Sequence, residues 1–267
     1  IYFSMVSCQI FNKKVKETKM KKLPIYIINL EKSTDRKAYM QAQFDQLFLD
    51  NTEPAIHFFK AINGKENPNH PLFQRYNEKK RLNVKGYPLT LNQLGCYASH
   101  YSMWEKCVEL DSPIIVLEDD AKFKDNFLDV LDFINSEKNT FEFFWLQPDR
   151  LKNKRKLVAD FGHFSVYQFS KGFIGATGYY LTPKAAKKFL AQSQEWYLTV
   201  DVTMDRFFEN KVPPYAIVPF CLEADYEIES TIFEKQKKVK TLKTVIAREL
   251  FNISTSIKRN IYNLLHP

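Results

Sequence analysis

Three adjacent carboxylates, Glu118, Asp119 and Asp120, follow the apolar run at 113–117. The run is short, rich in β-branched residues and bounded by polar residues, which predicts a buried strand. A parallel strand in an α/β sheet ends at the ligand crevice, where three like charges repel one another unless a cation or strong donors compensate them. Carboxylate oxygens suit Mg²⁺ or Mn²⁺, which also hold substrate phosphates. The cluster therefore predicts a metal–diphosphate site; a solvated acidic turn at a helix N-terminus is the alternative.

Side-chain direction separates the three carboxylates. Asp120 lies farthest past the strand end and is the first candidate for direct metal contact. If the strand continues, Glu118 points to the same side as Asp120 because strand residues alternate in direction. Glu118 is then expected at the metal or at a ribose. Asp119 would face the other way, where it either contacts the cofactor or has a structural role.

The elements that must position this cluster follow from apolar periodicity and turn residues. Strands are expected at 23–30, 56–59, 113–117, 143–146, 164–169, 173–181 and 216–218, and helices after Ser33, from Thr90, over 127–134, from Thr182-Pro183 and over roughly 200–210. The polar stretches 63–90 and 147–163 read as loops, the first with room for one short helix. A loop as long as 63–90 inside a compact domain is usually functional. The alternation of strands and helices predicts an α/β fold with a mainly parallel sheet.

Composition narrows the class of protein. The 267 residues are 45% hydrophobic, which is enough for a sizeable core in one or two domains. The sequence contains no run of 18 apolar residues, so no membrane-spanning helix is expected. Residues 1–19 lack the order of a secretory signal. The four cysteines form no metal-binding or disulfide spacing, so reduced thiols in a cytoplasmic protein are expected.

The net charge of +8 is concentrated at the two ends of the chain. Residues 235–267 carry +7 and residues 1–22 carry +5, which leaves a slightly acidic body at 23–234. A nucleic-acid-binding domain would spread basic surface across its fold, so no nucleic-acid partner is expected. We therefore divide the chain into an N-terminal extension at 1–22 that need not be native, a catalytic body at 23–234 and a basic tail at 235–267.

The tail has helical apolar spacing. Its apolar residues recur at steps of three and four: Leu242, Val245, Ile246, Leu250, Ile253, Ile257, Ile261 and Leu264. Basic residues flank them, and a basic amphipathic helix is typical of segments that lie on an anionic membrane surface. Packing against the body, or oligomerisation through a second subunit, is the alternative.

Five blocks of the chain, in order, resemble glycosyltransferase family 25, the bacterial lipooligosaccharide glycosyltransferases related to collagen galactosyltransferases. The blocks are the strand end 27–30 with 33–36, the helix segment 95–104, the acidic segment 117–121, the glycine-containing segment 175–180 and the pair Val200-Asp201. The resemblance covers roughly 23–232. The loop at 63–90 and the tail carry no assignment from it.

The resemblance implies a GT-A-like, Rossmann-type nucleotide-sugar-binding domain with a mostly parallel mixed sheet, a divalent metal and an inverting mechanism. The acidic cluster would be its version of the D-x-D metal motif, with Asp120 and Glu118 as ligands of Mn²⁺ or Mg²⁺. A metal neutralises the leaving diphosphate, and a carboxylate must take the proton of the acceptor hydroxyl. Asp201 is the candidate base, and Asp205 and Glu223 are the alternatives. If Asp201 is not the base, its carboxylate would stabilise the N-terminus of its helix.

The remaining candidates for donor binding are Asn29, Arg36, His100 and Gly178, together with Glu118 and Asp119. Asn29 and Arg36 lie at the first strand–helix junction, a nucleotide-binding edge in such sheets; a solvated helix-face arginine is the alternative for Arg36. His100 contacts diphosphate or sugar, or else is a satisfied buried histidine. Gly178, like Gly175, would permit close backbone approach to a sugar, or form a strand irregularity.

We expect a metal-dependent inverting glycosyltransferase that moves a hexose, galactose from UDP-galactose in a β-1,4 linkage, onto a terminal sugar of lipooligosaccharide. It would be cytoplasmic and peripheral on the inner face of the bacterial inner membrane, bound to anionic lipid through 235–267. The alternatives are a metal-dependent phosphohydrolase, which would need additional His or Asp ligands, and a non-enzymatic membrane-surface adaptor, which would have no nucleotide affinity. A Rossmann dehydrogenase is disfavoured because no glycine-rich turn follows the first strand.

Overall fold

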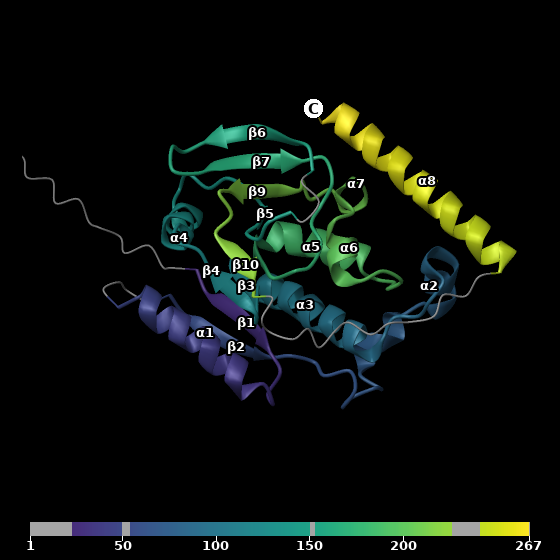
Figure 1. The fold of residues 1–267 in the computed structure, drawn as a ribbon, viewed down its shortest axis with the longest axis horizontal. Helices are drawn as coiled ribbons and strands as arrows, with labels where there is room; N and C mark the ends of the chain where they lie inside the picture. Colours follow the sequence, from purple (N-terminus) through teal and green to yellow (C-terminus); the bar gives the residue numbers. More distant parts are fainter. Residues whose placement is uncertain (1–22, 50–53, 150–152, 226–240, 267) are drawn as a thin grey trace, which may run out of the picture.

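A computed structural model describes residues 23–49, 54–149, 153–225 and 241–266, and an eight-stranded sheet runs through the described part (Figure 1). The strand order is β2-β1-β3-β8-β5-β9-β7-β6. The strands are β1 (Ile25–Asn29), β2 (Ile56–Lys60), β3 (Ile114–Glu118), β5 (Phe143–Trp145), β6 (Arg155–Asp160), β7 (Ser165–Phe169), β8 (Gly178–Leu181) and β9 (Tyr215–Val218). The expectations for the N-terminal extension at 1–22 lie outside the described residues.

The sheet is mixed, so the predicted α/β class is confirmed but the mostly parallel arrangement is not. β1 pairs in parallel with both β2 and β3, and β5 with β9. β8 enters between β3 and β5 antiparallel to both, and the β6–β7 hairpin adds two further antiparallel pairings. Of these antiparallel pairs only β6 and β7 are joined by a short turn. The others join strands that are far apart in the chain, which local sequence pattern does not predict.

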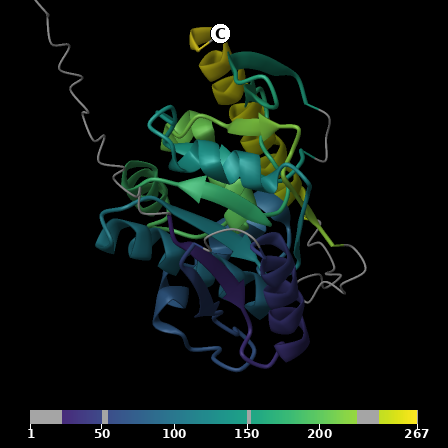
Figure 2. The same cartoon turned by 90° about the vertical axis from the view of Figure 1, so that its left-hand side faces the viewer.

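Helices cover both faces of the sheet. They are α1 (Thr34–Leu47), η1 (Pro71–Arg75), α2 (Glu78–Lys85), α3 (Leu91–Glu109), α4 (Phe127–Asn135), α5 (Pro183–Gln192), α6 (Val200–Met204), α7 (Phe207–Asn210) and α8 (Leu242–Leu265). Alternate residues of β3 serve the two faces: Ile114 and Val116 join the core under α3 and α5, while Ile115 and Leu117 join the core under α1 and α4. The side view shows α1 against the β1 end of the sheet (Figure 2).

A two-stranded sheet fixes the chain just after the acidic cluster. β4 (Ala121–Phe123) pairs antiparallel with β10 (Leu222–Ala224), and the backbone N–H of Asp225 donates to the carbonyl of Asp120 at 2.8 Å. The direction of Asp120 is therefore set by a segment about a hundred residues later in the chain.

Several boundaries differ from the sequence prediction. Part of the predicted loop 147–163 forms β6, a largely exposed strand whose sequence lacks the apolar alternation of a half-buried strand. The predicted strand 173–181 begins only at Gly178. The predicted helix 200–210 divides into α6 and α7, because the Asn210 side chain donates to the carbonyls of Thr203 and Met204 at the end of α6.

The helix predicted from Thr90 is confirmed as α3, which carries one wall of the functional cleft. Thr90 and Gln93 form a capping box at its start. The loop after β2 lies directly on α3, where the Ile62 N–H donates to Ser99 Oγ at 2.8 Å. A Cβ added at Gly95 would lie 2.3 Å from the Ile62 carbonyl oxygen and 2.8 Å from the Gly64 nitrogen. Glycine at 95 is therefore required for this contact between helix and loop.

α8 begins at a capping box formed by Thr241 and Thr244 and runs along the outside of the fold (Figure 1). It packs beside α2 and α7. Within the described residues no helix combines the length and the apolar composition needed to cross a bilayer. The predicted tail helix is thus present, and it lies on the outer side of the body.

We predict that Gly95→Ala destabilises the protein by about 1–3 kcal/mol, because the added methyl group meets backbone atoms that no side-chain rotation can move. Urea unfolding followed by circular dichroism measures the change. Glu105→Ala, an exposed position on the same helix, is the control and should stay within about 0.5 kcal/mol of the parent. Equal effects of the two substitutions would show that the close contact is unimportant.

Candidate active site

A cleft of about 370 Å³ opens where β1 and β3 end. It is lined by the ends of these strands, the first turn of α1, the loop after β2 and one side of α3: Ile28, Leu30, Lys32, Arg36, Ala61, Ile62, Asn63, Gly64, Lys65, Asn92, Cys96, Ser99, His100, Glu118, Asp119 and Asp120. Both the acidic cluster and the long loop predicted to be functional thus contribute to one cavity. Its position matches the crevice at the carboxyl ends of parallel strands where α/β proteins bind ligands.

Asp119 is held by the chain itself. Asn29 Nδ2 donates to its Oδ2 at 2.8 Å, and Arg36 Nη1 donates to its Oδ1 at 3.0 Å. Burial raises the pKa of Asp119, and the bonds from Asn29 and Arg36 act in the opposite direction. Asn29, Arg36 and Asp119 were all predicted to contact the donor. In the structure, Asn29 and Arg36 both donate hydrogen bonds to Asp119. Arg36 also lines the cleft, whereas Asn29 is buried beneath it.

Glu118 is oriented by a chain of hydrogen bonds that begins in the core. Trp104 Nε1 donates to Tyr179 Oη at 3.1 Å, and Tyr179 Oη lies 3.0 Å from His100 Nδ1. His100 Nε2 lies 3.2 Å from Glu118 Oε1. A carboxylate oxygen accepts, so His100 Nε2 is the donor to Glu118, and in that neutral tautomer Nδ1 accepts the hydroxyl proton of Tyr179. His100 is fully buried with both ring nitrogens in contact, so it positions Glu118.

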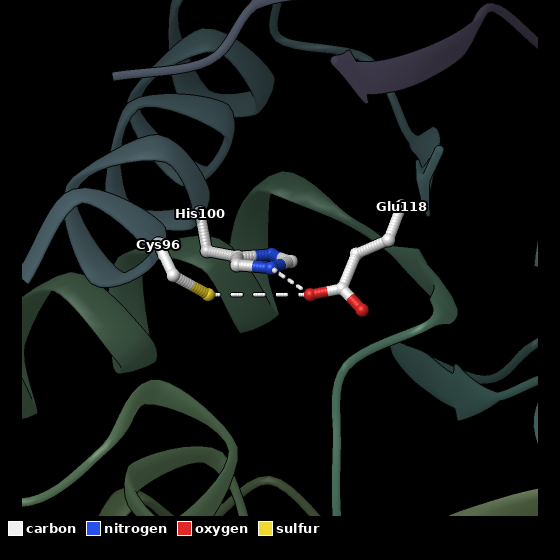
Figure 3. A group of neighbouring side chains, drawn as sticks. All are labelled: Cys96, His100 and Glu118. Atoms are coloured by element: carbon white, nitrogen blue, oxygen red, sulfur yellow. Dashed lines mark hydrogen bonds and ion pairs between the residues drawn. The ribbon is translucent and has the colours of Figure 1, made fainter. Parts of the chain in front are cut away.

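Cys96 completes a compact group with His100 and Glu118 (Figure 3). One ligand atom of each residue lies within 4.8 Å of the others, and Cys96 Sγ lies 4.0 Å from Glu118 Oε1. Burial raises the pKa of the Cys96 thiol well above its ordinary value, and the carboxylates of Glu118, Asp201 and Asp120 add to the effect. The protonated thiol and His100 both direct a hydrogen toward the same oxygen, while the second oxygen of Glu118 points away from them (Figure 3).

Asp120 is less well compensated than its two neighbours within the described residues, although the charge of Arg36 acts on it. Its Oδ1 is buried and has no hydrogen-bond partner among the described residues. Burial, followed by the charges of Glu118 and Asp119, raises its pKa to about 7. A divalent cation would relieve this repulsion, and the available ligands are the hard oxygens that Mg²⁺ and Mn²⁺ prefer. The donor set of Asp120 and Glu118 therefore fits such an ion.

Asp201 approaches from the C-terminal half of the body. It lies in the first turn of α6, and its Oδ2 accepts the N–H of Gly175 at 3.0 Å. Gly175 has φ +84°, in the left-handed region that glycine favours. Asp201 does not line the cleft, but it is close enough to Cys96 to raise the pKa of that thiol. Its charge therefore acts on Cys96, whose thiol contacts Glu118.

The two alternatives to Asp201 are engaged elsewhere. Asp205 Oδ2 accepts from Arg259 Nη2 of α8 at 3.0 Å, and Glu223 on β10 forms an ion pair with Lys124. Gly178, a predicted donor contact, lies in β8 away from the cleft. A Cβ there would come within 2.9 Å of side-chain atoms of Leu117 and Leu222, so packing alone accounts for this glycine.

Several residues that line the cleft carry no obvious signal in the sequence. Lys32, Lys65 and Asn92 come from a turn, a loop and the first turn of α3. Their chemistry is that of ordinary surface residues, and only the pairing of β1 with β2 and β3 brings them together. The Asn63-Gly64 turn was the one available hint, because such dipeptides mark sharp turns.

A family model described as glycosyltransferase family 25 (LPS biosynthesis protein) matches residues 22–204. The chain belongs to glycosyltransferase family 25. The matched segment contains Asn29, His100, the acidic cluster and Asp201, and it ends before β9, β10 and α8. The resemblance inferred from five ordered blocks is confirmed.

Individual family 25 relatives differ greatly in length. A glycosyltransferase 25 family member of Anopheles gambiae is 30% identical over 199 residues, which cover 70% of this chain and 32% of the relative. The lipooligosaccharide biosynthesis protein lic2B of Haemophilus influenzae is 26% identical over 265 residues, covering 90% of this chain and 95% of the relative. Procollagen galactosyltransferase 2 of Homo sapiens is 26% identical over 145 residues, 49% of this chain and 21% of the relative. The chain spans about a third or less of the first curated relatives it matches.

We predict that Asp205→Asn stabilises the protein more at pH 8 than at pH 5. Burial raises the pKa of Asp205 to about 7, against an ordinary value of 3.8; Arg259 opposes the shift and Asp201 adds to it. The folded state therefore holds a proton that the unfolded chain releases near pH 4, and this contribution to stability is lost as pH rises toward 7. Asparagine cannot ionise, so its advantage over aspartate should grow by on the order of 1 kcal/mol or more across that range.

Urea unfolding at pH 5 and pH 8 measures this difference. Asp132→Asn, at an exposed position of α4, is the matched control and should leave the pH dependence of stability nearly unchanged. If the free energies of unfolding of Asp205→Asn and of the parent differ by the same amount at both pH values, the pKa of Asp205 is not raised.

Proposed function

We propose that the chain transfers a hexose from a nucleoside diphosphate donor to a terminal sugar of lipooligosaccharide. The observation that carries the proposal is the buried Oδ1 of Asp120, which has no hydrogen-bond partner among the described residues, at the cleft formed by β1 and β3. The cleft offers three cationic side chains and three carboxylates within one cavity. Such a mixed lining suits a diphosphate that arrives with a divalent cation.

Asp120 and Glu118 would hold Mn²⁺ or Mg²⁺. When bound, the ion would neutralise charge on the departing diphosphate as a Lewis acid. Asp119 stays with Asn29 and Arg36, which keeps this carboxylate from competing for the ion. His100 and Cys96 restrain one oxygen of Glu118 and leave the other for the donor side of the cleft.

The basic side chains of the cleft would orient the donor. Arg36 lies between Asp119 and the cavity, and Lys32 and Lys65 line the same cavity. Fixed cations beside a diphosphate hold the sugar carbon in register with the acceptor, which is a large part of the rate enhancement of a two-substrate reaction. Asn92, at the start of α3, adds an amide that can contact ribose or sugar hydroxyls.

Asp201 would act as general base. Its carboxylate takes the proton of the acceptor hydroxyl as that oxygen attacks the anomeric carbon, and the bond from this carbon to the diphosphate oxygen breaks. Attack from the face opposite the diphosphate inverts the anomeric configuration. The Gly175 N–H fixes one oxygen of Asp201 at 3.0 Å, so the rotamer is set before substrate binds.

The names of the relatives support the finer assignment. The Haemophilus influenzae relative is named for lipooligosaccharide biosynthesis, and the human relative is named a procollagen galactosyltransferase. We therefore propose UDP-galactose as the donor, a lipooligosaccharide sugar as the acceptor and a β-1,4 linkage. Such an acceptor is lipid-linked, so the enzyme would work peripherally on the cytoplasmic face of the bacterial inner membrane.

We predict that Asp120→Asn lowers manganese-dependent affinity for UDP at least tenfold and lowers product formation in parallel, since one charged ligand of the ion is lost. Calorimetry of UDP with and without Mn²⁺ measures the first effect, and a UDP-release assay measures the second. Asp125→Asn, an exposed carboxylate five residues later, should retain both. Hydrolysis of donor at the same rate with and without acceptor would instead indicate a phosphohydrolase.

We predict that Asp201→Asn lowers kcat by about 10²–10⁴-fold, the usual contribution of a general base. Its UDP affinity with Mn²⁺ should stay within about threefold of the parent, because this carboxylate is not proposed to hold the ion. Asp129→Asn is the control, since Asp129 also lies in the first turn of a helix but at an exposed position of α4. Unchanged turnover of Asp201→Asn would remove Asp201 from the mechanism.

A further inference from the structure

The apolar side of α8 faces away from the body, which is the reverse of the arrangement in an ordinary surface helix. A helix on a globular protein normally turns its apolar side toward the core. Seven aliphatic side chains of α8 recur along one side and are between 51% and 78% exposed: Leu242, Ile246, Leu250, Ile253, Ile257, Ile261 and Leu264. We call these seven residues the outer stripe. At 1.5 Å per residue the outer stripe is about 33 Å long.

The opposite side of α8 meets the body through polar and aromatic contacts. Arg259 pairs with Asp205 of the α6 C-cap, and Arg206 Nη1 donates to Thr255 Oγ1 at 3.2 Å. Tyr262, the one buried residue of the helix, packs edge-on against Phe207 at 5.0 Å between ring centroids. At 100° per residue, these body-facing positions point about 180° away from the outer stripe. The docking contacts therefore fix the aliphatic side outward.

The spacing of the outer stripe favours a flat partner over a second copy of the helix. Successive members are separated by four, four and three residues, and this pattern occurs twice along the helix. A left-handed two-helix coiled coil needs a seven-residue repeat of 3.5 residues per turn. An eleven-residue repeat is closer to the 3.6-residue period, so the stripe stays on one side of a nearly straight helix.

The charge of α8 identifies the surface. The helix carries Lys243, Arg248, Lys258 and Arg259 against Glu249, a net charge of +3. Lys243 is exposed at the margin of the outer stripe, where its ammonium group can reach a surface that the stripe contacts. Lys258 and Arg259 pair with Glu209 and Asp205 of the body and add to the positive charge of the helix from that side. Such a helix binds anionic lipid by burying its apolar side at the headgroup boundary while cationic residues contact the headgroups.

We propose that α8 is a membrane-docking helix that lies in the plane of an anionic lipid surface with the outer stripe buried in it. The proposal does not depend on the sugar assigned above. It does fix how the body is presented to lipid, because Arg259 joins α8 to Asp205, four residues after the candidate base Asp201. α6 then lies between the lipid surface and the acidic cluster, on the side from which a lipid-linked acceptor would enter.

The test is co-sedimentation of the full chain with phosphatidylcholine vesicles that contain 30% phosphatidylglycerol. The double variant Ile253→Glu with Ile257→Glu should bind these vesicles at least tenfold more weakly than the parent. The control pair Asn252→Glu with Ser256→Glu adds the same charge at exposed positions outside the outer stripe. It should retain most of the binding. Thermal unfolding of both variants should match the parent, because none of the four side chains contacts the core.

Outcomes that overturn the proposal are specific. Equal loss of binding in both double variants would show that the helix is attracted to the anionic vesicles by charge alone and that the outer stripe does not insert into the lipid. Equal binding to vesicles with and without phosphatidylglycerol would remove the charge argument. A parent dimer in light scattering that Ile253→Glu with Ile257→Glu dissociates, with no vesicle binding, would assign the outer stripe to a second copy of the chain. Activity on a soluble acceptor, measured separately, tests the sugar transfer and leaves this result unaffected.

Discussion

Repulsion among three carboxylates at the end of β3 is the constraint on which the site depends. The chain compensates two of them with its own donors, since Asp119 receives Asn29 and Arg36 and Glu118 receives His100. The third, Asp120, keeps a buried oxygen without a partner among the described residues. An unpaired buried carboxylate is costly for stability. Its presence beside two satisfied ones is the observation on which the proposed cation site rests.

The compensating donors come from separate elements, and this explains several features of the fold. Asn29 ends β1, Arg36 begins α1 and His100 lies in the middle of α3. Parallel pairing of β1 with β3 places Ile28 opposite Glu118, which brings Asn29 next to the cluster. The buried relay from Trp104 through Tyr179 then ties α3 to β8 and fixes the imidazole. The antiparallel insertion of β8 beside β3, which breaks the parallel order, thus places a hydroxyl behind His100.

The sequence predicted what depends on local pattern. The strand before the acidic cluster, the helix beginning at Thr90 and the Thr182-Pro183 helix start were all readable from apolar spacing and capping residues. The role of Asp119 was left open between cofactor and structure, because the partners of a side chain depend on which strands pair. The edge strand β6 escaped prediction because its residues are mostly exposed, so its side chains show no alternation of apolar and polar residues.

The tail shows the same division between local pattern and tertiary arrangement. Apolar spacing predicted the α8 helix, but the direction of its stripe is decided by Arg259, Thr255 and Tyr262, which are unremarkable in sequence. Exposed apolar area costs about 25 cal/mol per Å² relative to burial, so a helix docked only for stability would turn its aliphatic side to the body. Because α8 contacts the body through an ion pair, a hydroxyl group and one aromatic ring, the free energy of burying its aliphatic side chains is not used within the fold. Burial against another surface could still release it. The polar contacts beneath α8 fix the helix on the body, and they leave its aliphatic side facing outward, where the proposed lipid surface would contact it.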